Sequence, residues 1–183
     1  MTRALLVLAL AWITACSSTL DRLPELGPER DAHYALGPGD VLQITVYDQP
    51  DLTGTYHISD SGSLAMPIIG ALPVQGLTLQ QLQRELIQRL QAKVVKAADV
   101  TLQVTEYRPF FILGEVKTPG SYPYVPNMTV LTAVAIAGGF TFRASQGEVS
   151  ITRQTTGQPH EARAPRAARI LPGDTIYVFE RHL

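Results

Sequence analysis

The sequence of 183 residues predicts an α+β fold of two small units. Segments with the two-residue alternation of strands outnumber helical segments, and each half of the chain contains one helix. A Pro-Gly-Asp motif before an alternating apolar run occurs twice, as LGPGDVLQITVYD at residues 36–48 and as ILPGDTIYVFE at residues 170–180. Because Pro and Gly supply the backbone angles of tight turns and Asp bonds to nearby amides, each copy predicts a turn that leads into a strand.

The first unit is expected to contain several short strands and one helix. The helix lies in GLTLQQLQRELIQRLQAK, where Thr78 and Gln81 have the spacing of a capping box and the apolar residues form one stripe. Its opposite face is rich in glutamine and poor in basic residues, so the helix is predicted to pack on a sheet and not to lie on a membrane. Strands are predicted at residues 41–47, 55–59, 64–66 and 100–105, with a hairpin turn at Ser61-Gly62.

The second unit is expected to pack strands around a short apolar helix. Gly138 and Gly139 follow this helix, at the position where a C-cap residue commonly adopts the left-handed conformation. The predicted elements are, in order, a strand at residues 110–116, a turn at Pro119-Gly120 with a return strand, the helix at 129–137, a strand at 149–153, a polar loop at 155–169 and a final strand after the second Pro-Gly-Asp motif.

The start of the chain is predicted to lie outside the folded body. Residues 1–15 have the basic start and apolar run of a secretory signal peptide, too short for a permanent membrane span. They end at the single cysteine, Cys16, in an aliphatic, small, small, Cys pattern that resembles the lipobox of bacterial lipoproteins. Acylation would account for a lone cysteine in an oxidising compartment, and an ordinary signal peptide is the alternative. Residues 16–33 are polar and hold two prolines, which predicts a flexible tether.

Composition and spacing favour no catalytic, metal or nucleic-acid site. The chain has 15 Lys and Arg against 16 Asp and Glu, without the clustered basic face that nucleic acid needs. Asp48 and Asp51 flank a proline in a loop, where acidic residues are expected, so the protein is predicted not to be an enzyme. No cofactor or metal ion is expected, since no spacing presents two imidazoles on one face among His33, His57, His160 and His182.

Taken together, these motifs resemble a known family. LGPGDVLQITVYDQPDLTG, SGSLAMPIIGALPVQGLTLQQLQRELIQRL and VTLQV resemble the polysaccharide export domain of the Wza-type outer-membrane polysaccharide export lipoproteins. ILGEVKTPGSYPYVPNMTVLTAVAIAGGFTFRA resembles the soluble-ligand-binding β-grasp (SLBB) domain that follows it in that family. The resemblance implies a polysaccharide export domain at residues 34–108 and an SLBB domain at residues 109–183. Larger relatives continue into a membrane-piercing helix, which needs ~20 residues, so the chain resembles the short class without that helix.

The resemblance implies a physical role in export. It implies a homo-oligomeric ring at the outer membrane, lipid-anchored and facing the periplasm, that conducts exopolysaccharide or capsular polysaccharide. Ser17 after the cysteine fits sorting to the outer membrane. The implied partners are the polysaccharide, an inner-membrane polysaccharide co-polymerase and a separate outer-membrane β-barrel. The alternatives are a non-oligomeric glycan-binding periplasmic lipoprotein and, after it, a glycan-processing enzyme.

Two further groups of residues are predicted to matter. Tyr56 and His57, near the first hairpin, are the expected glycan contacts, although most tyrosines in strands pack against their neighbours. The second group is expected to form structural turns and caps, and comprises Gly39, Asp40, Gly62, Gly70, Gly76, Gly114, Gly120, Gly138, Gly139, Gly173 and Asp174.

Overall fold

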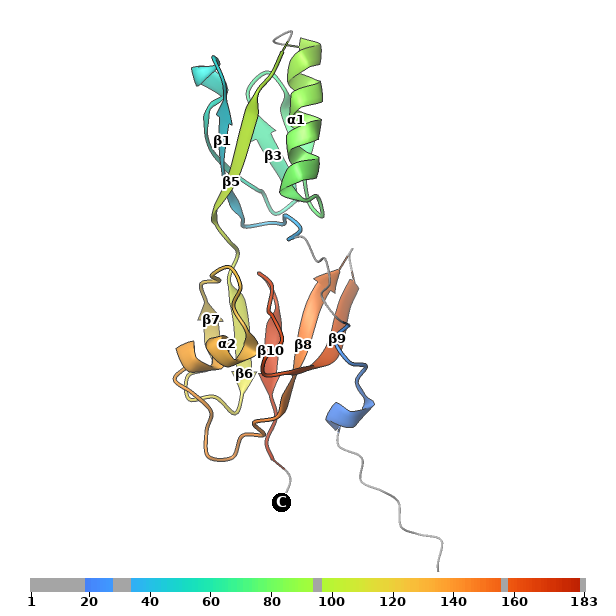
Figure 1. Cartoon of the computed structure of the whole chain (residues 1–183), viewed down its shortest axis with the longest axis vertical. Helices are drawn as coiled ribbons and strands as arrows, with labels where there is room; N and C mark the ends of the chain where they lie inside the picture. The colour runs from blue at the N-terminus through green and yellow to red at the C-terminus, as the bar shows by residue number, and fades with distance from the viewer. Residues whose placement is uncertain (1–18, 28–33, 94–96, 156–157, 182–183) are drawn as a thin grey trace, which may run out of the picture.

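The computed structural model describes residues 19–27, 34–93, 97–155 and 158–181. These residues form two domains, drawn one above the other in Figure 1, which meet close to residues 107–109. Both domains mix strands with one α-helix, so the predicted α+β class is confirmed. The predicted signal peptide and the predicted acylation site, Cys16, lie outside the described residues.

The first domain packs a helix and a β-hairpin against one face of a three-stranded antiparallel sheet. Its elements are β1 (Val41–Val46), η2 (Pro50–Leu52), β2 (Gly54–His57), β3 (Ser63–Met66), β4 (Gly70–Pro73), α1 (Leu79–Lys93) and β5 (Val100–Glu106). The sheet has the order β2-β1-β5, and β3 pairs with β4. Leu42, Ile44 and Val46 of β1 are buried in the core that α1 covers, and full burial of each such side chain stabilises the fold by about 1.5–3 kcal/mol.

The predicted capping box at the start of α1 is confirmed. The amide of Gln81 donates to Oγ1 of Thr78 (3.2 Å), and the amide of Thr78 donates to Oε1 of Gln81 (2.8 Å). Leu82, Leu86 and Leu90 are fully buried at helical spacing. The helix therefore packs on the sheet, as the sequence predicts.

The second domain is a five-stranded sheet with one helix on one face. Its elements are β6 (Phe110–Gly114), β7 (Gly120–Tyr122), α2 (Val130–Ile136), β8 (Glu148–Thr155), β9 (Gln158–Pro165) and β10 (Thr175–Val178). The order is β7-β6-β10-β8-β9, in which β10 runs parallel to β6 and the other neighbours are antiparallel. Val130, Ala133 and Val134 of α2 are buried against Phe110 and Ile112 of β6.

Glycines close several turns of both domains. Apart from Gly120, the predicted turn and cap glycines have positive φ, between 72° and 93°. Gly114 is the most confined, because a Cβ there would lie 2.1 Å from the carbonyl oxygen of Val178 on the paired strand. Only a residue without a side chain fits this approach of two backbones.

The prediction of a polar loop over residues 155–169 is wrong. Strand β9 occupies most of that segment and pairs along its length with β8. Ala162 and Ala164 are buried and alternate with charged residues, and Ala164 belongs to the second core. Alanine contributes little to an apolar pattern, and a proline argues against a strand. Pro159 is tolerated in β9 because this strand lies at the edge of the sheet. The local sequence therefore did not predict the strand.

The predicted hairpin at Ser61-Gly62 is shorter than expected. It closes with a bridge between Ile58 and Leu64 and with the amide of Ser59 bonded to the carbonyl of Ser63 (2.9 Å). Beyond this bridge the two strands separate. β2 pairs with β1, and β3 pairs with β4, a strand that the sequence did not predict.

Part of the predicted flexible tether contacts the second domain. After η1 (Thr19–Arg22), the amide of Leu26 donates to the carbonyl of Arg163 (2.7 Å), whose own amide donates to the carbonyl of Pro24 (2.8 Å). Leu26 packs against the second core, and Glu25 forms an ion pair with Arg163 (2.7 Å). This part of the segment is docked and not free, because it pairs with an edge strand and buries an apolar side chain.

Candidate functional site

The two Pro-Gly-Asp motifs build the same turn in different domains. Oδ2 of Asp40 accepts a hydrogen bond from the amide of Gly37 (2.8 Å), and Oδ2 of Asp174 accepts one from the amide of Leu171 (2.7 Å). The glycines of the two motifs have φ of 90° and 85°. The strands that follow, β1 and β10, belong to different sheets, so the repeat encodes one turn used twice and not a pair of strands.

Each of these aspartates is buried and bonded to an arginine. Nη1 of Arg108 lies 3.1 Å from Oδ2 of Asp40, and the Arg108 amide donates to Oδ1 (3.0 Å). Arg153 donates from Nε (2.9 Å) and Nη2 (2.7 Å) to the two oxygens of Asp174. Since an unpaired buried carboxylate costs several kcal/mol, each arginine compensates the burial of its partner.

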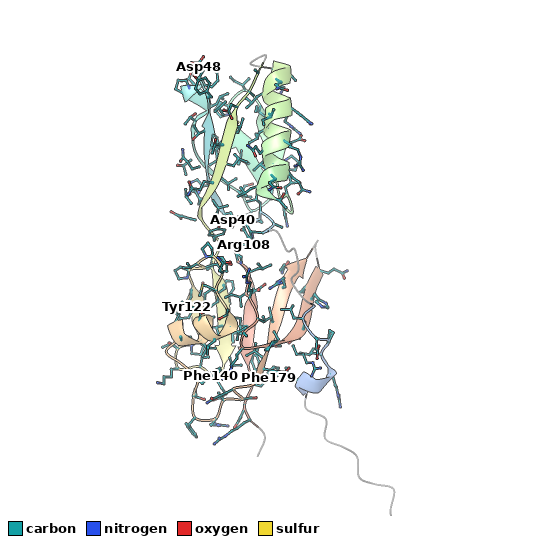
Figure 2. All side chains as sticks on the ribbon, viewed as in Figure 1. Asp40, Asp48, Arg108, Tyr122, Phe140 and Phe179 are labelled. Carbon is teal, nitrogen blue, oxygen red and sulfur yellow. The ribbon has the colours of Figure 1, made fainter. Side chains whose placement is uncertain are left out.

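Arg108 contacts the turns of both domains. A Cβ on Gly37 would lie 2.7 Å from its Nη1, and a Cβ on Gly173 would lie 2.7 Å from its Nε. The amide of Gly173 also donates to the carbonyl of Pro109 (3.0 Å). Figure 2 shows Asp40 and Arg108 at the point where the two domains meet. We call this contact region the junction, and its close packing couples the positions of the domains.

Three tyrosines extend the junction from one domain to the other. The rings of Tyr34 and Tyr107 meet edge to face with centroids 5.1 Å apart, and those of Tyr107 and Tyr124 meet in the same way at 5.4 Å. The guanidinium carbon of Arg108 lies 5.3 Å from the ring centroid of Tyr34. Such ring pairs contribute about 0.5–1.5 kcal/mol each beyond area burial, so the stack adds to the coupling of the domains.

Burial and Asp40 disfavour ionisation of two of these tyrosines. Burial raises the pKa of Tyr34 far above its ordinary value, and the hydrogen bond from its hydroxyl to Asp40 raises it further. Burial also raises the pKa of Tyr107, and the negative charge of Asp40 adds to the effect. Both phenols therefore resist ionisation even in alkaline solution, where an ordinary tyrosine begins to lose its proton.

The two predicted glycan contacts lie in different environments. Tyr56 packs against the first core, its hydroxyl donates to the carbonyl of Leu52 (2.8 Å), and burial raises its pKa. His57 is exposed at the end of β2. Glycan contact by either residue stays a prediction, and of the two residues only His57 has an exposed side chain.

The sheet of the second domain exposes apolar side chains on the side away from α2. Phe111 and Leu113 alternate with buried residues of β6, and the parallel register places Leu113 beside Tyr177 of β10. Phe111, Leu113 and Tyr177 are 43%, 45% and 44% exposed. The rings of Tyr177 and Phe179 are in edge contact, with centroids 4.8 Å apart. We call this surface the apolar face, and it consists of Phe111, Leu113, Tyr177 and Phe179.

Sequence reasoning missed both the apolar face and the role of Arg108. The run FFIL at residues 110–113 carried a signal for the apolar face, because a strand that is apolar at consecutive positions has two apolar sides. A single arginine before a proline gives no comparable pattern.

Other kinds of site find little support in the described part of the chain. Among the described residues no group of three or more His, Cys, Asp or Glu is placed to hold a metal ion. The helices of those same residues include none with the length and apolar character to cross a membrane. The carboxylates weighed for hydrolysis, Asp48 and Asp51, are exposed, and Figure 2 shows Asp48 at the end of the first domain remote from the junction.

Comparison with known protein families accounts for both domains. The family described as "Polysaccharide biosynthesis/export protein" matches residues 28–105, and the "SLBB domain" family matches residues 109–164. The chain belongs to the polysaccharide biosynthesis/export protein family. Its polysaccharide export domain and its SLBB domain meet at the junction, since Arg108 falls between the two matched ranges.

The chain is also similar to proteins named for polysaccharide production, export and transport. Exopolysaccharide production protein ExoF of Rhizobium meliloti (strain 1021) is 36% identical over 152 residues, which cover 76% of this chain and 34% of ExoF. EPS I polysaccharide export outer membrane protein EpsA of Ralstonia solanacearum is 32% identical over 185 residues, 81% of this chain and 48% of EpsA. Polysialic acid transport protein KpsD of Escherichia coli is 24% identical over 108 residues, 58% of this chain and 19% of KpsD. The chain thus spans less than half the length of these relatives.

Proposed function

We propose that this protein is a periplasm-facing outer-membrane lipoprotein that assembles into a ring and conducts exopolysaccharide or capsular polysaccharide during export. The observation that carries the proposal is the match of the first domain to the polysaccharide biosynthesis/export protein family, followed in the chain by a match of the second domain to the SLBB domain family. The relatives support it, since ExoF is named for exopolysaccharide production and EpsA for export at the outer membrane. The mechanism is physical, because copies related by rotation would enclose a hydrated passage.

Exposed apolar surface on two sides of the SLBB domain supports ring assembly. The apolar face lies on one side of the sheet, and on the other side α2 exposes Leu131 and Ile136, which are 48% and 45% accessible. A closed ring needs heterologous contacts, in which one surface meets a different surface of the next copy. Exposed apolar patches commonly mark such contacts. The apolar face and the outer side of α2 would form the two halves of the ring contact.

The docked N-terminal segment supports an orientation for the anchored protein. The three Cα-to-Cα steps from Cys16 to Thr19 span at most about 11 Å when extended, so an acylated Cys16 would lie close to η1. Figure 1 shows η1 beside the SLBB domain, toward the end remote from the polysaccharide export domain. The SLBB domain would then face the outer membrane, with the polysaccharide export domain deeper in the periplasm.

The proposed partners follow from this orientation and from the family resemblance. An inner-membrane polysaccharide co-polymerase would meet the polysaccharide export domain from below, and a separate outer-membrane β-barrel would receive the polymer above the SLBB domain. Several acyl chains on one ring would hold it by avidity, which makes the attachment effectively permanent.

Deletion of the gene is expected to remove extracellular polysaccharide, measured as secreted hexose, and the intact protein is expected to restore it. A Cys16→Ser variant is expected to restore it poorly, because the chain would lose its membrane anchor. Immunoblots of the two strains would confirm equal amounts of protein. Undiminished secretion with an altered chain length would contradict conduction and favour a glycan-processing enzyme.

The double variant Leu113→Asp/Tyr177→Asp is expected to dissociate the ring into single copies, since unpaired carboxylates are costly to bury in an apolar contact. Light scattering on the detergent-solubilised full chain measures the assembly. Gln88→Asp, at an exposed position of α1, is the matched control and should assemble like the intact protein. A ring that survives the double change would exclude the apolar face from the contact, and an intact protein that is already monomeric would support the non-oligomeric glycan-binding alternative.

A further inference from the structure

The outer side of the sheet in the polysaccharide export domain carries uncharged polar side chains. Leu42, Ile44 and Val46 of β1 face the core, so the residues between them point to the opposite side, away from α1 and the β3-β4 hairpin. The facing positions on β2 and β5 are exposed. We call this surface the polar face, and it consists of Gln43, Thr45, Thr55, Thr101 and Gln103.

Strand register arranges these side chains in rows. Gln43 lies between Thr55 of β2 and Gln103 of β5, and Thr45 lies opposite Thr101. Adjacent strands are about 4.8 Å apart, so each row places amides and hydroxyls next to one another across the sheet. The hydroxyl of Thr55 donates to Oε1 of Gln43 (3.0 Å), which orients that amide. Amide and hydroxyl side chains both donate and accept, which is also the bonding capacity of sugar hydroxyls.

The five residues of the polar face carry no charge. None of its five residues is Asp, Glu, Lys or Arg, so a chain that lies on it would meet only amide and hydroxyl groups. Charged side chains border it, with Asp48 directly after Tyr47, Asp99 before β5 and Glu106 as the last residue of β5. An uncharged, hydrogen-bonding surface complements a hydroxylated chain better than it complements a charged peptide or a nucleic acid.

An exposed aromatic ring stands at one end of the polar face. Tyr47 continues the outward alternation of Gln43 and Thr45 and is 78% exposed. Its amide donates to the carbonyl of Asp99 (2.9 Å), which extends the pairing of the two strands and holds the residue in place. A tyrosine ring that is open to solvent gains from packing on the apolar C–H face of a sugar ring.

We propose that the polar face, together with Tyr47, is the surface along which the exported polysaccharide passes, recognised through its hydroxyl groups. This inference rests on the proposed function and assigns the lining of the passage to the polysaccharide export domain. A conducting surface must hold its cargo weakly enough to release it. Uncharged hydrogen bonds satisfy that need, because bonds to ionised groups are about twice as strong.

A triple variant tests whether export depends on this surface. Gln43→Ala/Tyr47→Ala/Gln103→Ala is expected to lower secreted hexose about tenfold, by loss of weak contacts in every copy, while light scattering shows unchanged assembly. The matched control removes three exposed polar side chains from α1, and comprises Gln80→Ala, Gln88→Ala and Gln91→Ala. Full secretion by the triple variant would overturn the inference, and so would a loss of assembly, which would make the polar face a contact between copies.

Site-specific cross-linking tests contact directly with a single exposed substitution. Thr101→p-benzoylphenylalanine, irradiated in secreting cells, is expected to link the protein to the strain's own polysaccharide, detected as hexose that co-purifies with the denatured chain. The same group at Gln88 should link little hexose. Cross-links at Thr101 to a second copy of the chain, or no hexose while export continues, would overturn the inference. Secretion that persists after gene deletion would instead overturn the proposed function, so the two failures are distinguishable.

Discussion

Replacing Gly114 with alanine is expected to lower the free energy of unfolding by about 3 kcal/mol or more. Gly114 ends β6 with φ of 86°, and an added Cβ would lie 2.1 Å from the carbonyl oxygen of Val178. The left-handed conformation alone costs a residue with a Cβ about 1–2 kcal/mol. Relief of the clash would also separate β6 from β10, which are central strands of the second sheet. Urea unfolding followed by circular dichroism measures the change.

Gly70→Ala is the matched control for this change. Gly70 has nearly the same φ, 85°, but a Cβ there would meet nothing within 4 Å. Its substitution is expected to cost only the conformational term of about 1–2 kcal/mol. Equal losses at the two positions would show that backbone strain, and not the approach of Val178, sets the cost at Gly114.

Asp40→Ala is expected to destabilise the protein by about 3–5 kcal/mol, because it removes one partner from a buried ion pair. The Asp40 carboxylate accepts from the amides of Gly37 and Arg108, from the hydroxyl of Tyr34 and from the Arg108 guanidinium. All these donors would lose their acceptor at once. Since they hold the junction, urea unfolding is expected to separate into two transitions, one for each domain.

Glu85→Ala removes a carboxylate of the same kind at the surface of α1. Glu85 pairs with Arg89, but both side chains are 38% exposed, so its loss is expected to change the free energy of unfolding by less than about 1 kcal/mol. If Asp40→Ala cost no more than Glu85→Ala, the junction would contribute nothing to the coupling of the domains.

The parts of the fold that the sequence predicted correctly depend on neighbours in the chain. The capping box needs only Thr78 and Gln81, three residues apart. Likewise each Pro-Gly-Asp turn closes between an aspartate and an amide three residues before it. Such short-range bonds form whatever the rest of the chain does, so residue type and spacing suffice to predict them.

The parts that escaped prediction depend on distant residues. Arg108 bonds to Asp40 across 68 residues, and neither residue type nor spacing indicates that pair. Strand β9 is apolar only through Ala162 and Ala164, which the neighbouring β8 turns into core residues. Each strand of the polar face alternates apolar and polar residues, and that alternation is visible in the sequence. Only the register of the three strands, however, brings Gln43, Thr55 and Gln103 into one row. Tertiary pairing, and not local preference, decides these features.

The docking of the N-terminal segment on β9 imposes an order on folding. Glu25 and Arg163 are separated by 138 residues, so closing their contact costs much chain entropy and comes late. The strands and helix of the first domain lie between Val41 and Glu106 and can form before β9 has been synthesised. A nascent chain would therefore carry a folded first domain while residues 24–26 still lack β9, the strand with which they pair. Strand β9, one of the last elements to be synthesised, thus determines where the N-terminal segment, which is synthesised first, is docked.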